Sequence, residues 1–323
     1  MKHVYPVIAF LSFTYTLFFC TPVRAQTNPP SFKVVPLGVK GGLDESNLSA
    51  YMVAPGGSDA YICLDAGTLY SGIVKAIDSG VFEAPAADVL KNNIKAYFIS
   101  HPHLDHVAGL ILNSPEDSPK PIYGLQSCLD VLRDKYFTWE GWANFGDAGE
   151  KPQLNKYHYA FLVPGQETAI DHTDLKVTAY PLSHGAPYQS TAFLVNSANA
   201  SLLYLGDTGS DEVEHSDKLH QLWTAVAPLV KAGKLKAIFI EVSFPDEQPV
   251  KSLFGHLTPS LLNKEMLDLE MMTGEGPLRN VSIVITHRKP SGDQEALIQQ
   301  ELTRSNPLHL HWVYPLQGSL LKF

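Results

Sequence analysis

Three histidines and one aspartate stand within six residues of each other, in the segment His101-Pro102-His103-Leu104-Asp105-His106. The segment directly follows the apolar run 94–100, which has the length of a buried strand. Imidazole and carboxylate groups bind zinc or a similar ion while leaving positions open for water. The segment is therefore expected to bind a metal ion, and the alternative interpretation is a solvated histidine-rich loop. Six residues cannot surround an ion completely, so further ligands must come from elsewhere in the chain.

Three later residues have the same chemical character, and each follows an apolar run: His184, Asp207 and His287. Each is a weak signal alone. A histidine after a strand is more often a hydrogen-bonded surface or core residue, and a Gly-Asp turn is common. Because all three follow a strand and occur together with the histidine segment, the sequence predicts one metal centre built at strand ends.

These residues match, in order, the H-x-H-x-D-H motif, single histidine, bridging aspartate and final histidine of the metallo-β-lactamase fold hydrolases. The chain resembles that superfamily over nearly all of its length after residue 25. The resemblance implies two divalent metal ions, expected to be zinc, and a hydroxide that bridges them. It also implies the ligand sets: His101, His103 and His184 for one ion, Asp105, His106 and His287 for the other, with Asp207 between them.

Within the superfamily, residues 101–115 resemble the signature of class II cyclic-nucleotide phosphodiesterases, in which H-x-H-L-D-H precedes small and apolar residues and then Ser-Pro. Residues 241–244 and 255–259 resemble further blocks of that family. The resemblance implies hydrolysis of a small-molecule substrate, a 3′,5′-cyclic nucleotide (cAMP, with cGMP open), to the nucleoside 5′-monophosphate by the bridging hydroxide.

Three residues are assigned to the chemical step. Asp105 supplies both a metal ligand and a compensating negative charge. His256 is the expected proton donor to the leaving oxygen and Glu241 its orienting partner, a pairing that resembles the one in related tRNA-processing nucleases. The alternative for His256, held equally open, is a residue that caps or packs the following helix.

Two other functions remain in view. One is a different hydrolase on the same scaffold, namely an exported nuclease or phosphodiesterase, a thioesterase or a β-lactamase; the other is a metal-binding scaffold protein without turnover. Asp207 argues against the antibiotic-cleaving branches, which lack a bridging carboxylate there. The complete ligand set argues against the scaffold.

The first 25 residues are expected to be an export signal, because Lys2 and His3 precede an apolar run that ends near the small residue Ala25. An uncleaved anchor is the alternative. Cleavage before Gln26 predicts a periplasmic or secreted protein without stable membrane insertion, formed by a single catalytic domain over residues 26–323. Cys63 and Cys128 would remain, as buried thiols rather than a disulfide framework.

Charge sets a limit on partners. The chain has a formal net charge of −9, and loss of residues 1–25 removes two cations and no acid, giving −11. No basic arm is present, so a nucleic acid polymer is not an expected partner. Two divalent ions, two carboxylates and one hydroxide would leave about +1 at the site, which one phosphodiester anion neutralises. The sequence sets no oligomeric state.

Apolar patterns predict an αββα sandwich of two mixed β-sheets flanked by helices. The expected strands are 32–37, 49–54, 60–64, 94–100, 175–180, 191–195, 202–205, 235–240 and 281–285, and the expected helices are 86–93, 216–231, 259–272 and 293–304. The segment Arg133 to Tyr159 is expected to be a loop-rich insertion. Its aromatic residues would either pack on the surface or form a wall against an aromatic ligand.

Overall fold

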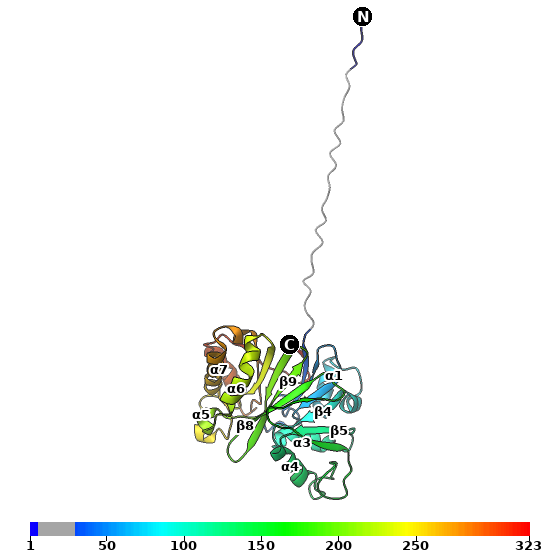
Figure 1. Ribbon diagram of the computed structural model, residues 1–323, viewed down its shortest axis with the longest axis vertical. Coiled ribbons are helices and arrows are strands. Elements are labelled where there is room, and N and C mark those ends of the chain that lie inside the picture. The colour runs from blue at the N-terminus through cyan, green and yellow to red at the C-terminus, as the bar shows by residue number, and fades with distance from the viewer. Residues whose placement is uncertain (6–29) are drawn as a thin grey trace.

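The computed structural model describes residues 1–5 and 30–323 and contains two seven-stranded sheets (Figure 1). Strands of the first sheet lie in the order β14-β1-β2-β3-β4-β5-β6. Their bounds are Phe32–Gly38 (β1), Ala50–Pro55 (β2), Tyr61–Leu64 (β3), Ile94–Phe98 (β4), Lys120–Gly124 (β5), Tyr157–Phe161 (β6) and Leu321–Lys322 (β14). The neighbours β14 to β3 pair antiparallel, and β3 to β6 pair parallel.

The second sheet has the order β13-β12-β11-β10-β9-β8-β7 and is also mixed. Its strands are Glu167–Ala169 (β7), Lys176–Ser183 (β8), Gln189–Ser197 (β9), Ala200–Leu205 (β10), Leu235–Glu241 (β11), Ser282–Thr286 (β12) and His311–Val313 (β13). Pairing is parallel from β13 to β10 and antiparallel from β10 to β7.

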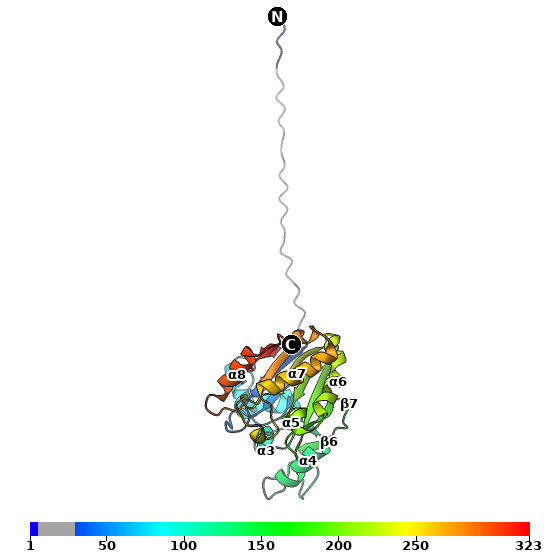
Figure 2. The same ribbon diagram turned by 90° about the vertical axis from the view of Figure 1, so that its left-hand side faces the viewer.

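Helices cover the outer faces of both sheets. In Figure 1, α6 and α7 lie on one side of the strands and α1 on the other, and Figure 2 shows α8 beside α7. The α-helices are Tyr70–Asp78 (α1), Ala86–Asp88 (α2), Leu104–Asn113 (α3), Gln126–Val131 (α4), Asp211–Glu214 (α5), Lys218–Lys231 (α6), Pro259–Thr273 (α7) and Gln294–Arg304 (α8). Short 3₁₀ or π segments are Val89–Asn93, Leu132–Tyr136, Val250–Ser252 and Pro277–Asn280.

The alternation of side chains along the strands explains the layers, because successive residues of a strand face opposite sides of a sheet. In β10, Leu202 and Tyr204 belong to the core between the sheets, whereas Leu203 and Leu205 belong to the core beneath the helices. All four are buried. Strands buried on both faces must be apolar at every position, which is why they were recognisable in the sequence.

The predicted sandwich of two mixed sheets is confirmed. Each predicted strand is present with shifts of a few residues at its ends, as are three of the four predicted helices, whereas the helix expected over 86–93 is the short α2 followed by the π segment Val89–Asn93. Cys63 and Cys128 are free and buried, as expected. The expected export signal falls mostly on residues 6–29, which lie outside the described part of the chain. Among the described residues no helix is long and apolar enough to cross a membrane.

The insertion Arg133 to Tyr159 is more ordered at its ends than the sequence suggested. A π segment begins before it, and β6 begins at Tyr157. Phe137, Tyr157 and Tyr159 are buried, and Tyr136, Trp142 and Phe145 pack against the core beneath α3 and α4. Most of these aromatic side chains therefore serve packing, although Tyr136 donates a hydrogen bond from its hydroxyl to the carbonyl of Pro102, 2.9 Å away, next to the histidine segment.

Candidate metal centre

Four strand ends bring the predicted ligands together. His101 follows β4, and His103 precedes α3, so that Asp105 and His106 lie in the first turn of that helix. The other predicted ligands lie at strand ends of the second sheet: His184 directly after β8, Asp207 two residues after β10, and His287 directly after β12. The centre thus lies where ends of both sheets meet.

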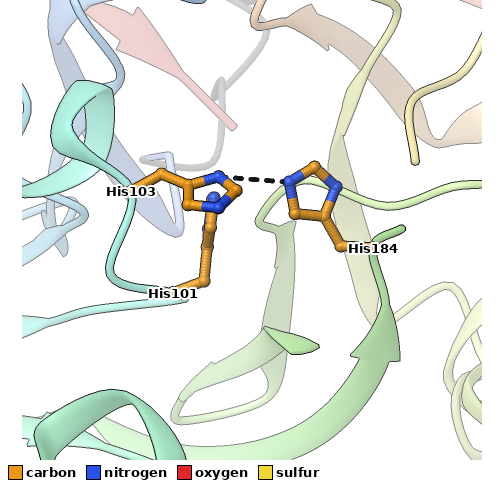
Figure 3. Close-up of side chains that lie close together, drawn as sticks. All are labelled: His101, His103 and His184. Carbon is orange, nitrogen blue, oxygen red and sulfur yellow. Dashed lines mark hydrogen bonds between the residues drawn. The ribbon is translucent and has the colours of Figure 1, made fainter. Parts of the chain in front are cut away.

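One group of ligands consists of three imidazoles, which turn toward one another in Figure 3. The ring centroid of His101 lies 4.5 Å from that of His103 and 4.9 Å from that of His184. Nδ1 of His103 lies 3.4 Å from Nε2 of His184 (Figure 3). His103 therefore presents Nδ1 to the centre, and His184 presents Nε2.

The second group combines Asp105, His106 and His287, with Asp207 between the two groups. Nε2 of His287 lies 3.1 Å from Oδ2 of Asp105. Oδ2 of Asp207 lies 3.2 Å from Nε2 of His287 and 3.3 Å from Nε2 of His106. The same oxygen is 3.7 Å from Nε2 of His101 and 3.8 Å from Nε2 of His184. A single carboxylate oxygen therefore borders both groups.

These separations fit shared coordination of metal ions. Metal–ligand bonds of about 2.0–2.2 Å in a tetrahedral arrangement put neighbouring ligand atoms roughly 3.4 Å apart. The Nε2 atoms of His101 and His106 are buried without a hydrogen-bond partner among the described residues. An unpartnered buried nitrogen is costly unless something binds it. The donor set, its spacing and these two nitrogens together fit ions at this place.

In four of the five predicted ligand imidazoles, Nδ1 is the outer nitrogen and is fixed by a hydrogen bond. Nδ1 of His106 donates to Asp65 at 2.8 Å, and Nδ1 of His184 donates to the Gly255 carbonyl at 2.8 Å. Nδ1 of His287 lies 2.9 Å from the Ser243 hydroxyl, and Nδ1 of His101 lies 3.0 Å from the Ser100 hydroxyl. A proton on Nδ1 leaves Nε2 as the electron-pair donor, which is the tautomer a metal ligand needs.

The predicted ligand histidines differ in the direction in which their surroundings shift the pKa. Desolvation, aided by neighbouring imidazoles, lowers the pKa of His103 to about 4 and holds the pKa values of His101 and His184 below their usual value. These three rings are therefore neutral near pH 7, as ligands must be. Burial opposes the charge on His106 as well, but Asp207, Asp65 and Asp105 outweigh it and raise its pKa. The same three carboxylates would attract a divalent cation.

His256 and Glu241 form a buried pair beside the ligands. Nδ1 of His256 lies 2.7 Å from Oε1 of Glu241, and Oε2 of Glu241 accepts a 2.6 Å hydrogen bond from the Ser243 hydroxyl. Burial alone would lower the pKa of His256, but the Glu241 carboxylate raises it. The predicted pairing is therefore present, and the Glu241 carboxylate favours the protonated form of His256.

The position of His256 fits two roles. Its ring stacks against His287 at 5.2 Å and lies 4.9 Å from the ring of His184. It also lies near enough to Asp207 and His184 to count as a ligand, since their ligand atoms lie within 4.8 Å of one another. The atom that faces Asp207, at 3.9 Å, is Nδ1, which also contacts Glu241. His256 could therefore bind a metal ion through Nδ1 only if its contact with Glu241 were lost.

Two supporting residues were missed in the sequence. Asp65 accepts hydrogen bonds from the Ser100 backbone, the Ser100 hydroxyl, His106 and the Tyr204 hydroxyl at 2.6–2.8 Å. Ser243 links Glu241, His256 and His287. Asp65 begins an Asp-Ala-Gly turn directly after β3, a signal that could have marked it as a further polar group at a strand end.

The fold and the centre define the class of protein. Unliganded yeast PDE1 superposes with a TM-score of 0.81 at 21% identity, covering 91% of this chain and all of that one. A metallo-beta-lactamase fold protein from Bacillus subtilis superposes with a TM-score of 0.59 at 17% identity, covering 90% of this chain and 99% of that one. The chain is a metallo-β-lactamase fold protein with a histidine- and aspartate-rich centre at the expected strand ends.

Sequence comparison then narrows the class. The profile of the class-II cAMP phosphodiesterases matches residues 82–308, and the chain belongs to this family. It is 43% identical to a 3′,5′-cyclic-nucleotide phosphodiesterase of Aliivibrio fischeri, over 95% of this chain and 98% of that protein. It is 40% identical to a probable 3′,5′-cyclic-nucleotide phosphodiesterase of Yersinia pestis, over 91% of this chain and 90% of that one.

Proposed function

We propose that this protein hydrolyses 3′,5′-cyclic nucleotides to nucleoside 5′-monophosphates with the help of two divalent ions, preferably zinc. The observation that carries the proposal is the position of Asp207, whose Oδ2 lies between two ligand groups of three residues each. Membership of the class-II phosphodiesterase family favours this reaction over the thioesterase, β-lactamase and scaffold alternatives.

The proposed ligands are His101, His103 and His184 for one ion and Asp105, His106 and His287 for the other, with Asp207 shared. Two ions there would supply a water nucleophile active at neutral pH and would offset the charge on the phosphoryl oxygens. The protein holds its ligands in one orientation through Asp65, Ser100, Ser243 and the Gly255 carbonyl. It thereby fixes where phosphorus must lie.

In the chemical step, water attacks phosphorus and the bond between phosphorus and the 3′-oxygen breaks. His256 donates its proton to the leaving 3′-oxygen, and Glu241 stabilises the imidazolium beforehand. Because Nδ1 is engaged with Glu241, Nε2 is the donating atom. A proton from the attacking water restores the imidazolium, so each turnover consumes one water molecule and leaves the protein unchanged.

Two exposed apolar side chains next to the centre suit a nucleoside. Tyr188 is 56% exposed, and its ring lies edge-on to His103 at a centroid distance of 4.8 Å. Leu104, between two proposed ligands, is also exposed. An aromatic and an aliphatic side chain next to a charged centre give a purine base an apolar surface while its phosphate reaches the ions.

The experiment is incubation of the purified protein with cAMP, cGMP and a linear phosphodiester, followed by product identification. We expect 5′-AMP from cAMP, and with ¹⁸O-labelled water one ¹⁸O atom in its phosphate group. Formation of 3′-AMP would contradict the proposed leaving group, and absence of turnover on both cyclic nucleotides would contradict the proposed substrate.

We also propose export from the cytoplasm, based on the charged start and apolar run of residues 1–25. The enzyme would then act on extracellular or periplasmic cyclic nucleotides.

A further inference from the structure

Lys289 lies at the edge of the centre, two residues after the proposed ligand His287. It is half-buried. Its backbone N–H lies 3.4 Å from the Ser243 carbonyl, which keeps the residue next to the Glu241–Ser243 segment. Its ammonium lies 5.6 Å from the centre of the Phe244 ring, within the range of a cation–π contact.

Two neighbouring features place this ammonium near the proposed reacting groups. The Phe244 ring that it covers lies 5.8 Å from the ring of His256, the proposed proton donor. On the other side, a Cβ atom on Gly42 would lie 3.9 Å from Nζ of Lys289, and the Gly42 N–H donates to Oδ2 of Asp105 at 2.9 Å. Nζ thus lies between the loop that holds Asp105 and the ring that borders His256.

The charge of Lys289 is not neutralised by the protein. Across residues 1–5 and 30–323, Nζ takes part in no ion pair and no hydrogen bond. Its neighbours differ, because Lys40 and Arg288 both pair with Glu295. A cation–π contact holds an ammonium in place but leaves its charge and its three donors free. A half-buried cation in that state is suited to an anion from outside.

We propose, on the basis of the function above, that Lys289 binds an anionic oxygen of the phosphate group in the substrate and in the product. An ammonium has no electron pair for a metal ion, so Lys289 complements the ions rather than joining them. A chain with a net charge of −9 repels nucleotides overall, and a cation placed at the centre provides local attraction. Lysine acts here as a point charge that can follow phosphate from substrate to product.

The test compares Lys289→Met, Lys289→Arg and Lys231→Met with the wild type. Methionine is an unbranched apolar side chain of similar length without the charge, and arginine keeps the charge. Lys231 is an exposed lysine at the end of α6, before β11 begins, and therefore lies at the opposite sheet edge. The readouts are metal content, binding of inorganic phosphate to the metal-loaded protein by calorimetry, and KM for cAMP.

For Lys289→Met we expect unchanged metal content and about tenfold weaker phosphate binding, with a similar rise in KM, because one charge-assisted hydrogen bond is lost. Lys289→Arg should stay within about threefold of the wild type, and Lys231→Met should equal it. Equal phosphate binding in Lys289→Met and wild type would overturn the proposal, as would equal weakening in Lys231→Met or loss of metal in Lys289→Met. If the wild type hydrolysed no cyclic nucleotide, the proposed function would fail, and phosphate binding would still decide the role of Lys289.

Discussion

At the residue scale, Asp207 has the most connected position in the centre. It is buried, and four imidazole nitrogens lie within 3.8 Å of its Oδ2. His287 and His106 outweigh the cost of burial and hold its pKa well below the usual value, so the group is ionised near neutral pH. Removing this carboxylate removes charge from both proposed ion positions at once.

We therefore expect Asp207→Ala to bind less than two ions per chain and to lose most of its activity on cAMP, by about 10²-fold or more. Asp105→Ala should lose as much activity, but it should lose only the ion proposed to be bound by Asp105, His106 and His287. Metal analysis after gel filtration distinguishes the two. Two tightly bound ions in Asp207→Ala would contradict its bridging position.

His256 gives a second prediction, which separates acid catalysis from metal binding. His256→Ala should keep both ions and lower turnover of cAMP by roughly 10²- to 10⁴-fold, whereas a substrate with a nitrophenol leaving group should be affected much less, because that group leaves without a proton. The kinetics of both substrates and the metal content are measured together. His220→Ala is the control, since His220 pairs with Asp268 in a similar way but at the surface.

An equal loss on both substrates would exclude the proton-donor role of His256. Loss of an ion in His256→Ala would instead identify it as a ligand, a role that its distance from Asp207 permits.

At the element scale, Asp65 ties together parts of both sheets. It lies just after β3 and binds Ser100 after β4, His106 in α3 and Tyr204 in β10. The turn formed by Asp65, Ala66 and Gly67 also packs closely against α3. A Cβ atom added to Gly67 would lie 2.0 Å from the Asp105 carbonyl oxygen, so only glycine fits there. The proposed metal ligands Asp105 and His106 of α3 are therefore held by the packing of this turn.

Asp65→Ala should lower the affinity for the ion held by His106 by about 10- to 100-fold, because the orienting acceptor of Nδ1 is lost. It should also lower the free energy of unfolding by about 2–4 kcal/mol, because four buried donors lose their partner. Metal titration and denaturant unfolding of the metal-free protein check the two effects. Asp78→Ala, an exposed acid at the end of α1, is the control, and unchanged metal affinity in Asp65→Ala would contradict the positioning role.

The gathering of the proposed ligands could be predicted from sequence because their residue types and their place after apolar strands carry the signal. Asp65 and Ser243 were missed. The position directly after β3 was a signal for Asp65, but its partners, such as Tyr204, lie far along the chain, and Ser243 has no comparable signal. Helix α3 was missed because its first residues look like a histidine loop, and its start is stabilised by Asp105 rather than by a side-chain cap. The edge strand β14 has two residues and is defined only by pairing with β1.

At the scale of the whole molecule, the N-terminal sequence predicts where the enzyme works. If residues 1–25 are an export signal, protein recovered from the producing cells should begin at or near Gln26 and lie outside the cytoplasm. An apolar run of that length left on a water-soluble enzyme would be an exposed patch without a partner. N-terminal sequencing of fractionated cells checks this, and an intact Met1 on soluble cytoplasmic protein would contradict it.

The proposed function needs both ligand groups, which lie at the ends of strands from both sheets, so activity should depend on two ions together. The most direct measurement is cAMP turnover by metal-free protein titrated with zinc, with bound metal and 5′-AMP determined at each point. We predict negligible turnover without metal and full turnover only as the second equivalent binds, with loss of activity on chelation. Full turnover by the metal-free protein, or at one equivalent, would contradict the two-ion account.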